Sequence, residues 1–190
     1  MACALTLPSD ITYACTDVAI GGIIELHIAN RDDVLATGIL TKNDANRSIS
    51  AGTALDAADV TQIAFNNKDG FSVFSEVKTV SADGIVATVP TISVETPKMT
   101  PAKNTALNDL SKGGAELAAF VRTAAGTYHV CGLDYGLYVS TVDANSGTGR
   151  SEKNRFQLTL TGDEQGLSYA ITGADEAAIK AIFDTVVGNP

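Results

Sequence analysis

Residues 133–162, LDYGLYVSTVDANSGTGRSEKNRFQLTLTG, decide the fold of this chain. In the second half of the stretch, Phe156, Leu158 and Leu160 alternate with polar residues. This period of two places the apolar side chains on one face of a strand. The first half is more apolar on both faces, and residues 143–149 between the halves are rich in turn-forming Asp, Asn, Ser and Gly. The stretch predicts two strands joined by a polar loop.

The loop gathers charged side chains in a chain that has few of them: Arg150, Glu152, Lys153 and Arg155. Two interpretations stay open. The charges either keep the tip of the loop in solvent, or they contact an acidic face of a neighbouring copy, because the net charge of the chain is −9. A heterologous contact of the second kind builds a ring when the rotation between copies closes.

Further strands follow from apolar patterns bounded by turn residues, at 23–29, 60–65, 71–80, 85–94 and 128–133. Asp83-Gly84 predicts a hairpin between 71–80 and 85–94. Apolar side chains fall on both faces of this hairpin, so we expect Phe71, Phe74 and Val80 at an interface between subunits. Pro90 has no N–H to donate, which predicts that its strand is an edge strand or is bulged.

Two helices are predicted. Thr100 and Pro101 begin the first, and its apolar stripe at Leu107, Leu110, Leu117 and Val121 continues towards Gly126 unless Gly113-Gly114 breaks it. The second contains Ile179, Ile182, Phe183, Val186 and Val187 at helical spacing, with Thr172 as a cap, acidic residues in its first turn and Gly188 at its end. These patterns predict a mainly β, α+β fold: an antiparallel β-sandwich or barrel with about two helices packed against it.

The length of 190 residues favours a single domain spanning 1–190, with an N-terminal arm at 1–20 and a long loop at 43–58. The acidic balance argues against wrapping nucleic acid, since that binding depends on Lys and Arg. Cys3, Cys15 and Cys131 have no metal-ligand spacing and are odd in number, so we expect buried thiols in a reducing compartment. No stretch predicts a signal peptide or a membrane span.

Motifs that would carry chemistry are incomplete. Residues 166–170 are not a nucleophile elbow, and residues 147–151 lack the lysine of a phosphate-binding loop. Residues 143–147 imitate only the start of a calcium loop. His27 and His129 lie among apolar strand residues, which is typical of interior or interface histidines with satisfied hydrogen bonds. We therefore expect no enzyme, no cofactor and no metal site.

Two segments carry a resemblance. Residues 143–148 with 154–164, and residues 15–30 near the N-terminus, resemble tail-tube and major tail-type virion structural proteins of tailed phages, especially those of Bacteroides-like hosts. The resemblance implies a β-sandwich whose copies form hexameric rings that stack into a tube, with hairpins joined into a β-barrel around a lumen. It implies assembly in the bacterial cytoplasm, other virion tail proteins as partners, no membrane, and DNA only as cargo. The net charge predicts an acidic lumen, which repels DNA.

Three alternatives remain: a capsid-associated or head–tail connector protein, a monomeric β-sandwich binding module, and an enzyme. The absence of Trp and an aromatic content of 6% weigh against a sugar-binding module. Residues 1–20 and 43–58 are the expected contacts between rings.

Overall fold

The computed structural model describes residues 21–36, 38–56, 59–65, 72–80, 83–84, 86–112, 114–149 and 152–188. The first strands and helices are β1 (Ile23–Asn30), α1 (Arg31–Val34), β2 (Leu40–Asn43), β3 (Ser48–Gly52), β4 (Val60–Gln62), β5 (Val73–Val80) and β6 (Val86–Pro97). They are followed by α2 (Pro101–Leu110), β7 (Leu117–Thr123), β8 (Tyr128–Cys131), β9 (Leu137–Asn145), β10 (Arg155–Gly162), β11 (Tyr169–Ile171) and α3 (Glu176–Val187). The predicted mainly β, α+β fold is confirmed; the expected arm at 1–20 lies outside the described residues.

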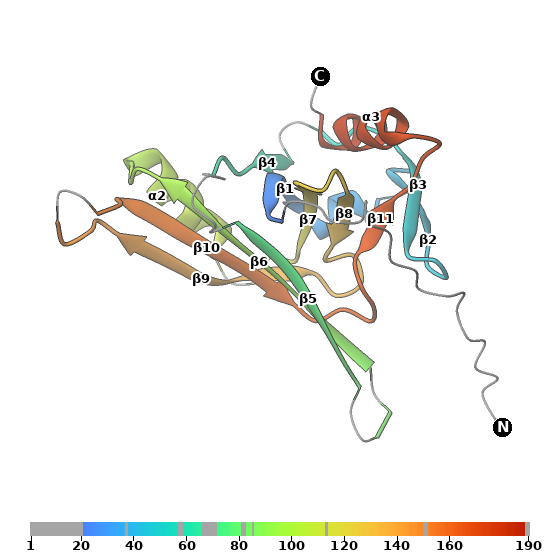
Figure 1. The fold of residues 1–190 in the computed structure, drawn as a ribbon, viewed down its shortest axis with the longest axis horizontal. Coiled ribbons are helices and arrows are strands. Elements are labelled where there is room, and N and C mark those ends of the chain that lie inside the picture. Colours follow the sequence, from blue (N-terminus) through green and yellow to red (C-terminus); the bar gives the residue numbers. More distant parts are fainter. Residues whose placement is uncertain are drawn as a thin grey trace.

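The strands form two layers (Figure 1). We call β9-β10-β6-β5 the long sheet and β4-β1-β7-β8-β11-β3-β2 the short sheet. The layers are joined where Leu117 of β7 pairs with Leu137 of β9. The bridge between Thr88 and Glu164 continues the register of β6 with β10 beyond the end of β10. Neighbouring strands are antiparallel except for β11 and β3, which are parallel. Figure 1 shows the β5–β6 and β9–β10 hairpins projecting at opposite ends of the molecule.

The strand β7 separates two hydrophobic cores, because both of its faces are apolar. Leu117, Ala119 and Val121 belong to the core that β7 shares with the long sheet and α2. Ala118 and Phe120 belong to the core beneath α3. The alternation of strand side chains explains why the run is buried on both sides. The long sheet contributes the expected inward residues of β10, Phe156, Leu158 and Leu160.

The helix α3 covers the outer face of the short sheet (Figure 1). Phe183, Val186 and Val187 are its buried residues, as its helical spacing predicts. Its cap is Asp175, whose carboxylate accepts from the N–H of Ala178, so the prediction of Thr172 as the cap is wrong. Gly188 ends the helix in the left-handed conformation, which glycine adopts without strain.

The first predicted helix is shorter than its apolar stripe. Its start is confirmed, since Thr100 accepts from the N–H of Lys103 and Pro101 is the first residue of α2. The helix ends at Leu110, and Leu117 and Val121 lie on β7. Gly114 has a φ of 95°, which no helix residue adopts, so the helix cannot continue through Gly114, and β7 follows as a strand. Gly113 lies outside the described residues.

Pro90 does not lie on an edge strand or in a bulge, so that prediction is wrong. Its strand β6 pairs with β5 on one side and β10 on the other, in unbroken register. Thr88 exchanges both backbone bonds with Glu164, and the next bonded position along β6 is Pro90, because bonded pairs alternate. Pro90 therefore leaves one ladder bond unmade, because it has no N–H to donate, while its carbonyl accepts from the Thr161 hydroxyl.

The expected long loop at 43–58 contains the strand β3, so that prediction is wrong over Ser48–Gly52. This strand pairs with β2 and, in parallel, with β11. Ile49 is its fully buried side chain and lies beneath α3. The segment is small and polar elsewhere, so long-range pairing forms the strand where the local pattern does not.

Candidate functional site

Three charged residues of the β9–β10 region, Glu152, Lys153 and Arg155, have partners within the subunit. Glu152 accepts from the N–H and the hydroxyl of Thr148, and the backbone hydrogen bond from Thr148 lowers the pKa of Glu152. Arg155 Nη1 donates to Glu95, a carboxylate that is 2% exposed, and Lys153 Nζ lies 3.6 Å from the same group. Arg150 lies outside the described residues. The structure thus brings Lys153 and Arg155 together on a partner that the sequence did not suggest.

The apolar interface candidates lie apart. Phe74 is half-buried against the core of the long sheet, and its ring centroid is 5.5 Å from that of His129. Val80, at the far end of the same strand, is 66% exposed. Phe71 lies outside the described residues. Of the three, Val80 is the one that the described structure places on the surface.

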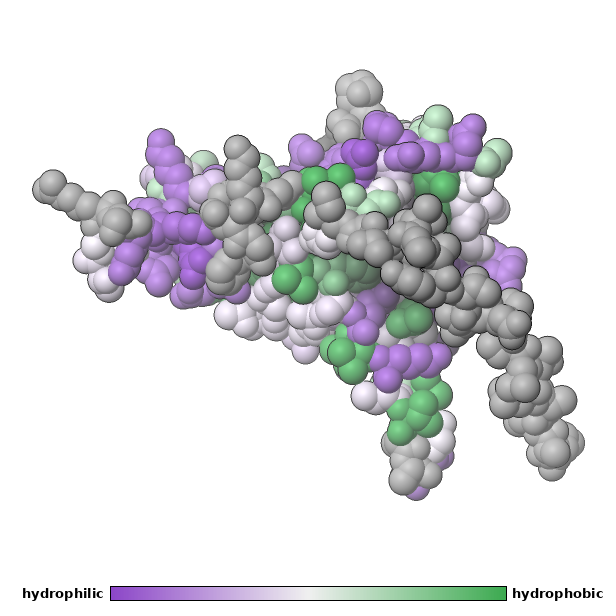
Figure 2. Space-filling view, in the orientation of Figure 1, coloured by the Kyte–Doolittle hydropathy of each residue, from purple (hydrophilic) through white to green (hydrophobic). Residues whose placement is uncertain are grey.

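The exposed apolar side chains of the long sheet concentrate on the β5–β6 hairpin: Val73, Val77, Val80 and Val86. Figure 2 shows this hydrophobic surface on the hairpin that projects from the body of the molecule. Other large apolar side chains are also exposed, at Ile24, Tyr135, Tyr138 and Leu167. A projecting hairpin whose valines face solvent on both of its sides is typical of a surface that another chain covers.

Both edges of the long sheet lack a neighbouring strand in the described ranges. On one edge, β5 pairs with β6 alone. On the other, β9 pairs with β10 along its length, and with β7 only at Leu137. Backbone N–H and C=O groups on such edges are available to a strand of another chain. Sequence patterns cannot find these edges, because edge position depends on the order of strands in the sheet.

The outer face of the long sheet is rich in hydroxyl groups. The side chains that alternate with the buried residues share this face, and they include Ser75, Thr79, Thr91, Ser93, Thr141, Thr159 and Thr161 together with the exposed Val73, Val77 and Tyr138. The Ser93 and Thr159 hydroxyls hydrogen-bond to each other at 2.8 Å. The charged groups Glu95, Asp143 and Arg155 share this face near the β9–β10 loop. The rest of the face, towards the β5–β6 hairpin, is uncharged.

A second cluster of polar residues, which the sequence analysis missed, surrounds Arg47 near the short sheet. Arg47 Nη1 donates to Asp134 at 2.9 Å, Nη2 lies 3.6 Å from Glu164, and the guanidinium lies 4.2 Å from the Tyr169 ring centroid. The Tyr169 hydroxyl donates to Asp44 at 2.8 Å. Arg47 has a φ of 46°, a strained conformation held by these contacts. Four of these residues, Asp44, Arg47, Asp134 and Tyr169, line an open polar pocket of about 360 Å³.

The two carboxyl groups of this cluster titrate differently. Burial raises the pKa of Glu164 to about 7, against the backbone N–H groups of Asp134 and Tyr135 that donate to it. Burial also acts on Asp134, but the hydrogen bond and charge of Arg47 outweigh it and hold the pKa of Asp134 below its usual range. The cluster ties the β2–β3 turn to the loops before β9 and after β10. No signal along the sequence joins Arg47, Asp134 and Glu164.

The histidines are buried or half-buried with polar partners, as expected. His27 Nε2 lies 2.9 Å from a Glu25 oxygen, and His129 contacts the hydroxyls of Ser168 and Thr127, each at 3.1 Å. Burial lowers the pKa of His129, and it raises the pKa of the buried Cys131 thiol. Cys3 and Cys15 lie outside the described residues.

Neither a metal centre nor a membrane helix is found in the part of the chain that the structure describes. No three His, Cys, Asp or Glu side chains there are grouped to hold a metal ion. None of the helices there is long and apolar enough to cross a membrane.

Comparison of the chain with protein-family models, curated proteins and solved structures finds no match.

Proposed function

We propose that this chain is a virion structural protein whose copies assemble into rings, and that the rings stack into a phage tail tube. The observation that carries the proposal is the long sheet, with β5 on one edge and β9 on the other and no neighbouring strand for either in the described ranges. Such edges invite strand addition by another chain. Copies of this chain can supply a partner strand for both edges, because each copy carries a β5 edge and a β9 edge.

The strand directions favour a ring over a two-fold dimer. Each strand of the long sheet is antiparallel to the next, so β5 and β9 run in opposite directions. When copies are related by rotation about an axis along the strands, β5 of one copy meets β9 of the next as an antiparallel pair. This contact is heterologous and closes into a barrel that has no edges. A dimer through β5 alone leaves both β9 edges open.

The hydroxyl-rich face of the long sheet is the surface we assign to the lumen. The opposite face is occupied by the core and α2, so the hydroxyl face alone can face a central channel when the sheet closes. Away from the charged end beside the β9–β10 loop, this face carries Ser, Thr and apolar side chains, which offer DNA phosphates few cations to bind. The proposed lumen thus allows DNA to pass by lacking attraction, and not by the acidic repulsion expected from net charge. The resemblance to tail-tube proteins suggests six copies in each ring.

Lys78 gives the experiment that tests the proposal. It lies on β5 opposite Thr88, and Thr88 directs both of its backbone bonds to Glu164 on the far side of β6. The N–H and C=O of Lys78 therefore point to the unpartnered edge. Lys78→Pro removes that outward donor without breaking a bond to β6, and Lys78→Ala is the matched control that keeps it.

The measurement is light scattering after size exclusion, with electron microscopy of protein at raised concentration. We expect wild type and Lys78→Ala to form rings, while Lys78→Pro stays monomeric with unchanged circular dichroism. Equal assembly by Lys78→Pro, or a wild type that remains monomeric at every concentration, contradicts the proposal. Rings of wild type that never stack favour the connector alternative.

A further inference from the structure

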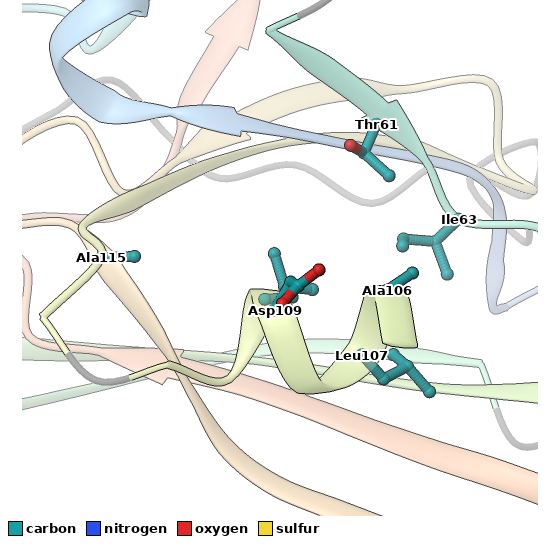
Figure 3. Close-up of a pocket in the computed structure, with 7 residues that line it drawn as sticks. Thr61, Ile63, Ala106, Leu107, Asp109 and Ala115 are labelled. Atoms are coloured by element: carbon teal, nitrogen blue, oxygen red, sulfur yellow. The ribbon is translucent and has the colours of Figure 1, made fainter. Parts of the chain in front are cut away.

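An apolar groove lies between α2 and the end of β4. It has a volume of about 380 Å³ and is lined by Thr61, Ile63, Ala106, Leu107, Asp109, Leu110 and Ala115. Figure 3 shows Thr61 and Ile63 on one wall and the α2 residues Ala106, Leu107 and Asp109 on the other. A smaller hollow adjoins it and adds Thr96 and Lys103 to the lining. We call the two together the α2 groove.

The β5–β6 hairpin ends in an apolar pair, which we call the valine tip. Val80 and Val86 are directly opposite each other in the register, and they are 66% and 41% exposed. They share the face of the sheet that carries Phe74 and Ile92, but they lie beyond the body that covers those residues. Lys78 and Asp83, both exposed, flank the pair.

The valine tip and the α2 groove lie on one face of the sheet at opposite ends of β6. Val86 begins this strand, and Thr96, in the groove lining, lies near its end. The two positions are an even number of residues apart in a strand of unbroken register, so their side chains point to the same side. At about 3.3 Å per residue they are roughly 33 Å apart. A shift of one copy along its strands by this distance brings its tip over the groove of another copy.

We infer that the valine tip of one copy seats in the α2 groove of the copy stacked above or below it. The inference rests on the proposed function and names the contact that joins one ring to the next. The apolar pair fits the apolar lining, and both surfaces carry charges of both signs: Lys78 and Asp83 beside the tip, Asp109 and Lys103 in the groove lining. Asp109 also pairs with Lys112, and Lys103 donates to the Pro97 carbonyl. The tip and the groove are different surfaces at opposite ends, so the contact repeats without closing and extends a tube.

The first test compares Val80→Asp with Thr79→Asp. Both place a carboxylate at the exposed end of β5, but Thr79 lies on the opposite face, so it serves as the control. We expect Val80→Asp to form rings and lose tubes in electron micrographs, while Thr79→Asp forms both. Tubes of Val80→Asp equal to wild type overturn the inference and leave the proposed function standing. If wild type forms no rings, the proposed function fails and the inference falls with it.

The second test uses disulfide trapping in the full chain. In a background with Cys3→Ser and Cys15→Ser, the double variant Val80→Cys with Ala106→Cys should form disulfide-linked ladders on oxidation of tubes. Thr79→Cys with Ala106→Cys should not, because the side chain at position 79 points to the opposite face of the sheet and a disulfide needs Cβ atoms about 3.5–4.5 Å apart. Ala106→Cys alone, with Cys3 and Cys15 kept, tests whether the N-terminal residues of the same chain occupy the groove instead. A disulfide from Ala106→Cys to Cys3 or Cys15 within one chain would place the N-terminal residues in the groove and overturn the inference.

Discussion

Glu95 and Arg155 form a diagonal ion pair across β6 and β10. Arg155 Nη1 donates to Glu95 Oε2 at 2.5 Å, although the residue directly opposite Glu95 is Gln157. Glu95 is buried, and the cationic groups near its carboxylate are Arg155 and Lys153. Arg155, expected from the sequence at a contact between copies, thus has a partner within its own subunit.

Removing the cation of this pair should destabilise the subunit. We expect Arg155→Met to lower the free energy of unfolding by about 3 kcal/mol, because it leaves a buried carboxylate with only the distant Lys153. Adding Glu95→Gln to this variant removes the stranded charge and should restore part of the loss. Urea denaturation of the two single variants and the double variant measures the coupling. Strictly additive losses would show that the pair does not act as a unit.

Reversing the loop charges should weaken assembly more than folding. Lys153 is about half exposed, so exchanging it costs the subunit about 0.2–1 kcal/mol. Arg150→Glu with Lys153→Glu should form fewer rings at equal concentration, and added salt should narrow the gap because it screens surface charges. Lys153→Gln is the control, since it removes charge without adding repulsion. Unchanged ring formation by the charge-reversed protein in low salt would leave the loop a solubilising role only.

The elements that the sequence predicts well are those whose signals are local. The strands β1 and β10, both hairpins and the end of α3 follow from alternation, from turn residues such as Asp83-Gly84, and from Gly188. The extent of α2 is missed because Leu117 and Val121 fit a helical stripe as well as a strand. Only the burial of β7 on both faces separates the two interpretations, and burial is a property of the whole fold.

The surfaces that carry the proposals depend on strand order and could not be predicted. The edge status of β5 and β9 follows from which strands pair, and the sequence states no pairing across long separations. The Arg47 cluster joins residues from three distant loops, so no spacing marks it. Val80 differs from these surfaces, because the apolar pattern on both faces of its hairpin predicts an interface residue, and the structure leaves its side chain exposed.

The raised pKa of Glu164 makes stability depend on pH in a direction unusual for a carboxyl group. Its pKa is about 7 in the folded chain and near 4.5 when unfolded, so the folded state binds the proton more tightly between these values. The stability that this proton contributes is present below pH 4.5 and is lost as pH rises to 7. The lowered pKa of Asp134 acts in the opposite direction, and only under more acidic conditions.

Glu164→Gln isolates this effect, because the amide is neutral at every pH. We expect the melting temperature of wild type to fall relative to that of Glu164→Gln between pH 5 and pH 8. Thermal unfolding of both proteins in matched buffers measures the difference. A constant difference across this range would mean that Glu164 is ionised throughout, held so by Arg47 and the two backbone N–H groups.

The seat of α3 on β3 leaves no room for a side chain at Gly52. A Cβ atom there would lie 2.2 Å from Cγ2 of Val186, a fully buried and branched side chain that cannot turn away. Gly52→Ala should therefore cost about 1–3 kcal/mol in urea denaturation, the range for overpacking a core. Gly149→Ala is the control, because nothing lies within 4 Å of its Cβ position. The double variant Gly52→Ala with Val186→Ala removes the clash. Its loss of unfolding free energy should therefore be smaller than the sum of the losses of the two single variants. If Gly52→Ala is as stable as wild type, α3 does not pack on β3 at this distance, and the core beneath it is looser than described.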